Sequence, residues 1–396
     1  MMSFLTFILL LTIGLVVYNY LLYPLVLAFF SKGKSIKGEE FSRSELPKIA
    51  LVFSAYNEEK VIVDKLINLD SLDYPLDRLD IHVGLDHPDD QTASLIMQHC
   101  PQNFPFFVHH FKERSGKANV LNKIFNYSLE IADYDVVVMT DANIISKENC
   151  LIELAKYFKN EDVGLVAAVI ENGIKDDTEI AKQEQYYIKK ESQIKVHEGL
   201  LFGATIGAFG ACYAIRSKYV KPIPSNFLME DFYLSLNVLE EDAICMTNPE
   251  AIVYEDLPGT LQEEFKRKRR ISTGNFQNLK TYIHLLWTKN WRVGLPFFSH
   301  KILRWISPFL ILTAIILSCL LLAMEPNSFF YRLVFILMLV NLILPLVDIV
   351  LKRMNISVNL LRLHRYFISM NIAMFLGFID WIQGVKTNIW KPTERL

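Results

Sequence analysis

Hydrophobic and polar residues are distributed unevenly along the 396-residue chain. Residues 1–31 contain no charged side chain, and residues 305–324 form a second uncharged run, long enough as a helix to cross about 30 Å of hydrocarbon. A third apolar run, 333–351, is interrupted only by Asp348. We expect these runs to be membrane helices, one before and two after a polar central region.

The fourth apolar run, 366–379, is shorter. Its fourteen uncharged residues end at Asp380. Runs of about 10–14 residues are more typical of re-entrant or interfacial helices than of membrane-spanning ones. The run therefore either crosses the membrane with Asp380 facing protein or lies at the surface, which leaves two or three membrane segments within 305–386.

Residues 281–304 interleave aromatic and cationic side chains at helical spacing, among them Trp287, Lys289, Trp291 and Arg292. Aromatic and cationic residues of this kind concentrate where a membrane meets water. The pattern predicts an interfacial amphipathic segment between the central region and the C-terminal membrane region.

Basic residues follow the first apolar run directly: Lys32, Lys34, Lys37 and Arg43. The run has no basic segment before it and no small-residue cleavage pattern after it, so 1–31 predicts a retained anchor rather than a cleaved signal. Excess Lys and Arg mark the cytoplasmic flank of a membrane helix. We expect a multi-pass protein of the inner (plasma) membrane with a cytosolic domain at 46–280, and we leave open the side on which the basic tail 387–396 lies.

Between the membrane runs, short β-rich runs alternate with amphipathic segments, which is typical of an α/β fold. The expected strands are 49–54, 80–85, 106–111, 135–140, 163–170 and 208–215, and the expected helices are 58–69, 90–99, 117–130 and 147–158. Ligands of open α/β sheets bind at the carboxyl ends of the strands. Functional residues are therefore expected at the strand ends.

Three strand ends carry candidate binding residues. The candidates are Ala55, Tyr56, Asn57 and Glu58 after the first strand, Asp86 after the second, and Asp141 after the fourth. Asn57 and Glu58 could also serve only as a cap and a favourable charge at a helix start. Asp86 could accept hydrogen bonds from a nucleoside base or ribose.

Gly116 and Lys117 precede an expected helix, with Arg114 nearby. Backbone N–H groups at a helix start, together with cationic side chains, suit an anionic phosphate. A carboxylate beside a diphosphate is most useful as a cation ligand, because Mg²⁺ usually takes one or two carboxylates plus phosphate oxygens. Asp141 is therefore a candidate metal ligand.

Overall charge and cysteine content add little. The net charge of −2 points to no nucleic-acid partner, and we expect none. The five cysteines are not spaced like metal ligands, and cytosolic thiols stay reduced. We interpret them as packing residues: Cys100, Cys150, Cys212, Cys245 and Cys319.

Taken in chain order, the motifs resemble those of the family 2 glycosyltransferases, which are inverting, nucleotide-sugar-dependent enzymes of the GT-A (Rossmann-like) fold, and in particular the bacterial exopolysaccharide and cellulose-synthase-like members. The similar segments lie within about 47–274 and read VFSAYNEEKVI, DHPDDQT, SGKANVLN, TDAN, TIGAFGACYAIR and FLMEDFYLSLNV. The last two resemble the glycine-rich acceptor-side strand, with Gly207 and Gly210, and the Glu-Asp motif of the family.

The resemblance implies a role for each matching residue. Ala55, Tyr56, Glu58 and Asp86 would contact the nucleotide, and Lys117 the diphosphate. Asp141 and Asn143 would hold a divalent cation, Mg²⁺ or Mn²⁺, although the neutral Asn143 replaces the commoner Asp of the family. Asp231, with Glu230 beside it, would be the catalytic base that takes the acceptor proton during direct displacement at the anomeric carbon.

The basic run at 267–270 departs from the family pattern. Arg267 and Arg270 are candidates for diphosphate contacts, but processive synthases usually carry Gln-x-x-Arg-Trp here, and this chain has Ile271 in place of the tryptophan. Attraction of this run to anionic lipid is an equally good interpretation, and the two are compatible. We therefore expect one or a few sugar additions rather than processive synthesis.

The expected donor is a nucleotide-diphosphate sugar, most naturally a UDP-sugar. The expected acceptor is a membrane-associated glycan or lipid-linked molecule in exopolysaccharide or cell-surface glycan synthesis, with a polysaccharide export or synthase protein as a further partner. The alternatives are a processive polysaccharide synthase and a membrane nucleotidyltransferase, although the latter should carry a glycine-rich basic loop near its first strand. A non-catalytic membrane scaffold would have no need for Asp86, Asp141 and Asp231.

Overall fold

The computed structural model describes two compact units. The helical unit comprises Met1–Val26, Thr260–Phe276 and Phe297–Gln383, and the sheet unit comprises Leu27–Gly259, Gln277–Pro296 and Gly384–Leu396. The structure describes residues 1–35, 38–131, 133–173, 179–256, 260–288, 291–356 and 358–389. Each unit is described by itself.

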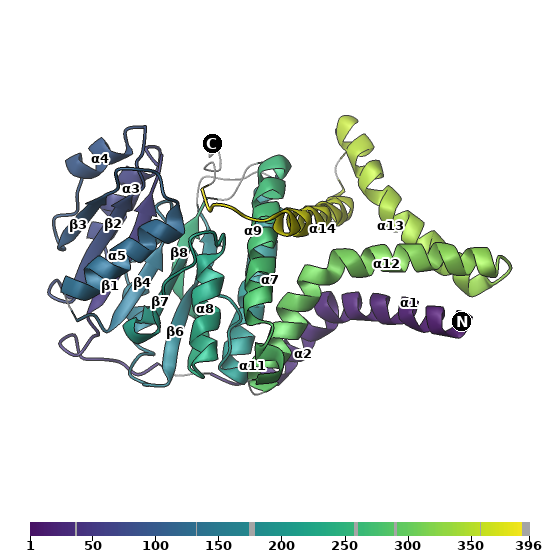
Figure 1. Cartoon of the computed structure of the whole chain (residues 1–396), viewed down its shortest axis with the longest axis horizontal. Helices are drawn as coiled ribbons and strands as arrows, with labels where there is room; N and C mark the ends of the chain where they lie inside the picture. Colours follow the sequence, from purple (N-terminus) through teal and green to yellow (C-terminus); the bar gives the residue numbers. More distant parts are fainter. Residues whose placement is uncertain are drawn as a thin grey trace. The chain divides into compact units, whose positions relative to one another are not determined.

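The sheet unit is built on an eight-stranded mixed sheet with the order β3-β2-β1-β4-β7-β6-β8-β5 (Figure 1). The strands are β1 Ile49–Ala55, β2 Leu79–Leu85, β3 Phe106–His110, β4 Val136–Thr140, β5 Ile145–Ser146, β6 Val163–Asn172, β7 Cys212–Arg216 and β8 Ile244–Glu255. The strands β1 to β4 pair in parallel, whereas β7 is antiparallel to both β4 and β6. The predicted α/β fold is confirmed.

Helices cover both faces of this sheet. The helices that lie entirely within the sheet unit are α3 Ile62–Asp70, α4 Thr92–Gln98, α5 Lys117–Ile131, α6 Cys150–Ala155, α7 Glu179–Phe202, α8 Glu230–Glu240, α10 Leu285–Thr288 and α11 Trp291–Pro296. Figure 1 shows α5 and α8 lying over the strands on one face. On the other face, residues of α3 and α6 join alternate strand residues in one apolar core.

The strand β4 shows why a parallel strand is apolar throughout. All five residues of Val136–Thr140 are buried, because helices cover both faces of the sheet. Successive side chains point to opposite faces. Val136 and Val138 thus join the core with α3 and α6, while Val137 and Met139 face the other layer.

Several element boundaries differ from the sequence-based expectation. The helix expected at 58–69 begins only at Ile62, because Asn57 has a positive φ of 52° and the chain turns before the helix starts. The strand expected at 208–215 begins at Cys212, since Gly207 has a φ of 76° and its Cα lies against the ring of Phe232 in α8. The strand β8 and the helix α7 were not expected from the sequence.

The helical unit contains the apolar runs. Its elements are α1 Met2–Val17, the π-helix η1 Tyr18–Leu22, part of α2 Tyr23–Ser31, part of α9 Leu261–Tyr282, the π-helix η3 Phe297–Ile302, α12 Leu303–Met324, α13 Phe329–Arg353 and α14 Asn359–Gln383. Among the described residues, four helices are long and apolar enough to cross a membrane: Met2–Ser31, Trp291–Met324, Phe329–Arg353 and Asn359–Gln383.

The fourth apolar run belongs to a longer helix than its fourteen uncharged residues indicate. The helix α14 has 25 residues, and Asp380 near its end accepts two hydrogen bonds of 2.6 Å from Arg269 of α9. Asp380 thus faces protein, as the membrane-spanning alternative requires. The segment expected to be interfacial divides into the short helix α10 and a helix that starts at Trp291 and continues into α12.

Candidate active site

Three elements of the sheet unit bring charged side chains together. Lys117 is the first residue of α5, Asp141 directly follows β4, and Glu230 is the first residue of α8. The Lys117 ammonium lies 2.6 Å from Asp141 Oδ1 and forms a second ion pair with Glu230. Burial alone would lower the pKa of Lys117, but the two carboxylates outweigh it and raise this pKa above its usual value. Lys117 is therefore charged at neutral pH.

Asp231 is the second residue of α8 and is buried. Its Oδ1 accepts a 2.7 Å hydrogen bond from the Phe232 amide. Its Oδ2 approaches Gly210 so closely that a Cβ there would lie 2.9 Å away, so the glycine leaves room for this carboxylate. Burial, followed by the charge of Glu230, raises the pKa of Asp231 to about 6. Such a carboxylate is a stronger base than an ordinary Asp and is ionised at neutral pH.

Asp86 organises the loop before α5. Its Oδ1 accepts hydrogen bonds from the Ser115 amide (2.6 Å) and hydroxyl (3.2 Å), and its Oδ2 accepts one from the Gly116 amide (2.9 Å). Gly116 has a φ of 84°, which favours glycine. Asp86 therefore fixes the backbone directly ahead of Lys117, and its carboxylate oxygens retain lone pairs for a ligand.

The turn after β1 lies beside this loop. The Ala55 carbonyl accepts a 3.1 Å hydrogen bond from the Asp86 amide, and the Arg114 guanidinium lies 3.6 Å from the centre of the Tyr56 ring. The Glu58 amide donates to the Thr92 hydroxyl at 2.7 Å. The structure thus brings the predicted residues of 55–58 next to the predicted Asp86.

Lys65 was not expected to be part of the site. It lies on the buried face of α3 between Ile62 and Leu66, and its ammonium donates to Thr140 Oγ1 (3.2 Å) and to the Ile144 carbonyl (2.7 Å). Burial lowers the pKa of Lys65 to about 8. These two hydrogen bonds stabilise the turn that carries Asp141. A lysine on an otherwise apolar helix face is the sequence pattern that could have revealed Lys65.

Tyr213 was also missed. It lies in β7 opposite Met139 of β4, on the sheet face covered by α5 and α8, because its neighbours Cys212 and Ala214 point into the core with α3 and α6. Its hydroxyl is buried and has no hydrogen-bond partner in the described part of the chain. Burial, and after it the negative charge of Asp231, raises the pKa of Tyr213.

The C-terminal segment of the sheet unit reaches the same loop. Asn388 is buried against Gly116, so closely that a Cβ on the glycine would overlap its side-chain oxygen. The Asn226 amide donates to the Val385 carbonyl at 3.2 Å. No local sequence pattern indicates this contact, because the two segments lie far apart in the chain.

Arg267 and Arg270 lie on the part of α9 that belongs to the helical unit. The Arg267 guanidinium is 3.5 Å from Glu264, which is itself buried and also paired with Lys268 at 3.2 Å. The role of these two arginines in diphosphate binding stays a prediction.

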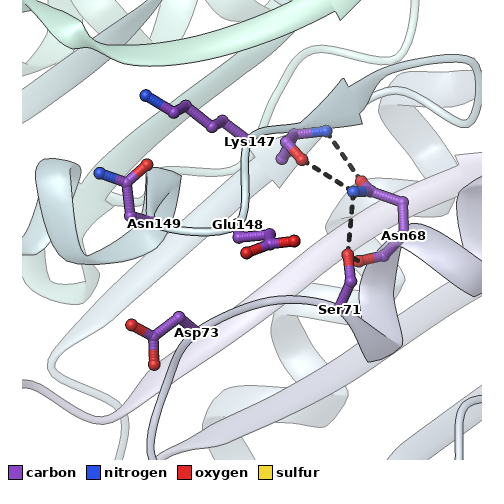
Figure 2. A pocket seen from close by; sticks show the side chains of 7 residues that line it. Asn68, Ser71, Asp73, Lys147, Glu148 and Asn149 are labelled. Carbon is purple, nitrogen blue, oxygen red and sulfur yellow. Dashed lines mark hydrogen bonds between the residues drawn. The ribbon is translucent and has the colours of Figure 1, made fainter.

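A polar hollow of about 530 Å³ lies elsewhere on the sheet unit (Figure 2). It is lined by Asn68, Ser71, Asp73, Ser146, Lys147, Glu148 and Asn149. The Asn68 amide group both donates to the Ser146 carbonyl (2.7 Å) and accepts from its amide (2.8 Å). These bonds join α3 to β5, and none of the predicted site residues lines this hollow.

A divalent cation fits the chemistry at the end of β4. No group of three or more His, Cys, Asp or Glu side chains that could hold a metal is found among the described residues. Asp141 nevertheless offers a partly exposed carboxylate, and Asn143 an amide oxygen, two residues apart. Mg²⁺ keeps waters and binds through one or two carboxylates plus phosphates, so this small donor set is sufficient when a diphosphate supplies the other ligands.

The sheet order and the charged strand ends define an α/β enzyme with the GT-A fold. Residues 51–222 match the model of Glycosyl transferase family 2. This part of the chain is a family 2 glycosyltransferase domain, and the protein is a glycosyltransferase.

A solved structure supports the fold. The mannosyltransferase PcManGT from Pyrobaculum calidifontis, in complex with GDP-Man and Mn²⁺, is similar with a TM-score of 0.69 and 18% identity, over 95% of this chain and 99% of that one. S. aureus TarS 1–349 in complex with UDP-GlcNAc matches with a TM-score of 0.41 and 13% identity, over 85% of this chain and 92% of that one. No curated protein sequence matches the chain significantly.

Proposed function

We propose that the protein transfers a sugar, with inversion, from a nucleotide-diphosphate sugar to a hydroxyl of a membrane-associated glycan or lipid-linked acceptor. The observation that carries this proposal is the buried Asp231, whose pKa is raised to about 6 beside the ion pairs of Lys117 with Asp141 and Glu230. A carboxylate that is ionised at pH 7 yet strongly basic suits proton removal from an alcohol.

In the proposed reaction, the acceptor oxygen attacks the anomeric carbon while its proton passes to Asp231. The bond from that carbon to the diphosphate oxygen breaks on the opposite face, so the configuration inverts. Glu230 and Asp141 hold Lys117 at the site, where its positive charge attracts the diphosphate. A divalent cation held by Asp141 and Asn143 would neutralise part of the charge on the leaving diphosphate.

A panel of nucleotide sugars tests the identity of the donor. The similar mannosyltransferase structure contains GDP-Man and Mn²⁺, which supports a nucleotide-sugar donor and a divalent cation. UDP-sugars remain the first expectation, and a donor panel should therefore include both UDP- and GDP-sugars. We further propose a plasma-membrane location with the sheet unit in the cytosol, supported by the basic residues that follow the first span.

The alternative of processive synthesis is tested by product length. We propose that the enzyme adds one or a few sugars and releases the product, because Ile271 offers no aromatic face to hold a sugar. Products formed at excess donor are expected to be short while most acceptor is unused. Long polymer at that stage would favour the processive alternative.

The decisive variant is Asp231→Asn, which keeps the size of the side chain and removes its basicity. We expect kcat for transfer to fall by about 10²–10⁴-fold with little change in donor affinity. The matched control is Glu241→Gln at the other end of α8, an exposed carboxylate paired with Lys221. Full transfer by Asp231→Asn would remove Asp231 from the mechanism.

The pH dependence gives a second check. Wild-type activity should fall about tenfold per pH unit as the pH drops below 6, because Asp231 then holds a proton. The folded state binds this proton more tightly than the unfolded state, so the associated stability is lost as the pH rises through 6. Asp231→Asn should therefore unfold at a higher temperature than the wild type at pH 7.5. An inactive variant that is more stable than the wild type has lost the catalytic group and not the fold.

A further inference from the structure

The glycine-rich segment before β7, residues 205–211, contacts two helices of the sheet unit. At its start, the Thr205 hydroxyl donates to the Lys195 carbonyl of α7 at 3.0 Å. Further along, the Ala208 amide donates to the hydroxyl of Ser235 in α8 at 2.9 Å. The segment is therefore held by α7 and by α8 together.

The contact with α8 reaches the candidate base. The Ser235 hydroxyl that accepts from Ala208 donates in turn to the Asp231 carbonyl at 2.6 Å. Gly210 lies against the Asp231 carboxylate, because a Cβ at this glycine would be 2.9 Å from Oδ2. The segment thus meets both the backbone and the side chain of Asp231, and a shift of the segment would displace the carboxylate.

The side chain of Lys195 contacts the same segment from α7. Lys195 is only 3% exposed, and its ammonium lies 3.4 Å from the centre of the Phe209 ring. A cation above an aromatic ring is attracted by the negative face of the ring. Phe209 directly precedes Gly210, so two consecutive residues connect the Lys195 ammonium to the Asp231 carboxylate.

The charged and titratable groups around Asp231 come from several elements. They are Glu230 of α8, Lys117 of α5, Lys195 of α7, Tyr213 of β7 and, through its ion pair with Lys117, Asp141 after β4. Burial and then Glu230 raise the pKa of Asp231, and the charges of Lys117 and Lys195 oppose this shift. On its own helix face, Lys195 is flanked by the buried carboxylates Glu191 and Glu198.

We propose that Lys195 is a positioning residue for the transfer reaction. It holds Phe209 and the glycine-rich segment against α8, and its positive charge keeps the neighbouring Asp231 carboxylate ionised. The inference rests on the proposed function, in which Asp231 takes the acceptor proton. Lys195 acts through Phe209 and through its charge, and it extends to lower pH the range in which Asp231 can accept a proton.

The first test is the pH profile of kcat for the full chain. Lys195→Met keeps the length of the side chain and removes its charge. Because a nearby cation lowers the pKa of a carboxylate, the fall in kcat at low pH should move upward by about half a pH unit or more, which is about threefold less activity at pH 5. Loss of packing alone would lower kcat equally at every pH.

Two further variants complete this measurement. Lys195→Arg keeps the charge and the contact with the Phe209 ring, so it should restore the wild-type profile. Lys189→Met is the matched control, because Lys189 is an exposed lysine of the same helix, and its profile should equal that of the wild type. A wild-type profile in Lys195→Met, or a profile that Lys195→Arg does not restore, would overturn the proposal.

The second test does not depend on transfer. Unfolding temperatures of the detergent-solubilised chain are compared at pH 7.5 for the wild type, Asp231→Asn, Lys195→Met and the double variant. Without Lys195 the ionised carboxylate is less stable in the folded state, so Asp231→Asn should raise the unfolding temperature more in the Lys195→Met background than in the wild type. Equal increases in the two backgrounds would show that Lys195 does not act on Asp231. If Lys195→Met does not fold, Lys195→Gln takes its place in both tests.

The outcomes separate this inference from the proposed function. Full transfer by Asp231→Asn would overturn the proposed base, and the role of Lys195 in transfer with it. Loss of transfer in Asp231→Asn, combined with a wild-type pH profile in Lys195→Met, would overturn only the inference about Lys195.

Discussion

The two units place apolar and polar side chains in opposite ways. In the sheet unit, the apolar residues form a buried core and the charged residues gather at the strand ends. In the helical unit, large apolar side chains face outward, for example Phe4 at 64% exposed and Leu346 at 60%, while Asn19 and Asp348 are buried.

The amount of exposed apolar surface indicates the surroundings in which each unit is stable. Contiguous apolar surface on this scale is unfavourable in water and marks a contact with lipid or protein. In lipid, apolar surface provides no driving force for helix association, and polar contacts between helices contribute instead. Polar side chains inside the helical unit therefore contribute to contacts between helices, whereas Lys117, Asp141 and Glu230 of the sheet unit form the candidate active site.

The largest expected effect tests the buried ion pair of the helical unit. Arg365 lies 3.0 Å from Asp348, whose side chain is 3% exposed. Arg365→Met leaves a buried carboxylate without its cation and should lower the free energy of unfolding by about 3–5 kcal/mol. The double variant with Asp348→Leu should recover most of this loss in denaturant unfolding of the detergent-solubilised protein.

Arg353→Met, at the exposed end of α13, is the control for that measurement. Its free energy of unfolding should stay close to that of the wild type. If the double variant is as unstable as Arg365→Met alone, the stability of these helices depends on the ion pair itself. It would then not depend on avoiding an unpaired buried charge.

The next effect concerns the carboxylate at the end of β4. Asp141→Asn removes the negative charge that can hold a cation, and it should weaken divalent-dependent nucleotide binding by at least about tenfold. Calorimetric titration of Mn²⁺ with a nucleoside diphosphate measures this. Asp135→Asn, just before β4 at the other end of the strand, should bind normally, and equal affinity of the two variants would contradict the metal assignment.

A smaller effect is expected for Lys65, which hydrogen-bonds to the turn that carries Asp141. Lys65→Met removes the hydrogen bonds to Thr140 and Ile144, and it should lower cation affinity by about tenfold, as loss of residues that orient metal ligands typically does. The titration used for Asp141→Asn provides the measurement. Lys60→Met, on the exposed turn before α3, is the control. Unchanged affinity in Lys65→Met would limit this lysine to a role in stability.

The smallest effect is expected at Tyr213. Tyr213→Phe removes a buried hydroxyl that has no partner in the described structure, so the free energy of unfolding should stay the same or rise by up to about 1 kcal/mol. The Phe variant should also bind the donor with unchanged affinity. Any effect of the hydroxyl on the reaction would then appear in kcat or in its pH profile. Destabilisation by more than about 1 kcal/mol would reveal a bound water or another partner of the hydroxyl.

Local sequence pattern was sufficient for the sheet strands and for the apolar spans. The strands β1, β2, β3, β4 and β6 were expected within two residues of their observed bounds, because buried strands are short apolar runs with turns on either side. The uncharged runs likewise predicted three spans. Motif order in the sequence was enough to indicate a family 2 glycosyltransferase, which the family match confirms.

Only the tertiary structure decided how the charged residues act on one another. Lys117, Asp141 and Glu230 come from separate parts of the chain, and their ion pairs exist because α5 and α8 begin where β4 ends. The raised pKa of Asp231 and the lowered pKa of Lys65 depend on burial, which no local pattern fixes. The contact of Asn388 with Gly116 and the pairing of Asp380 with Arg269 likewise depend on long-range packing, because a side chain's partner is set by the fold and not by its neighbours in sequence.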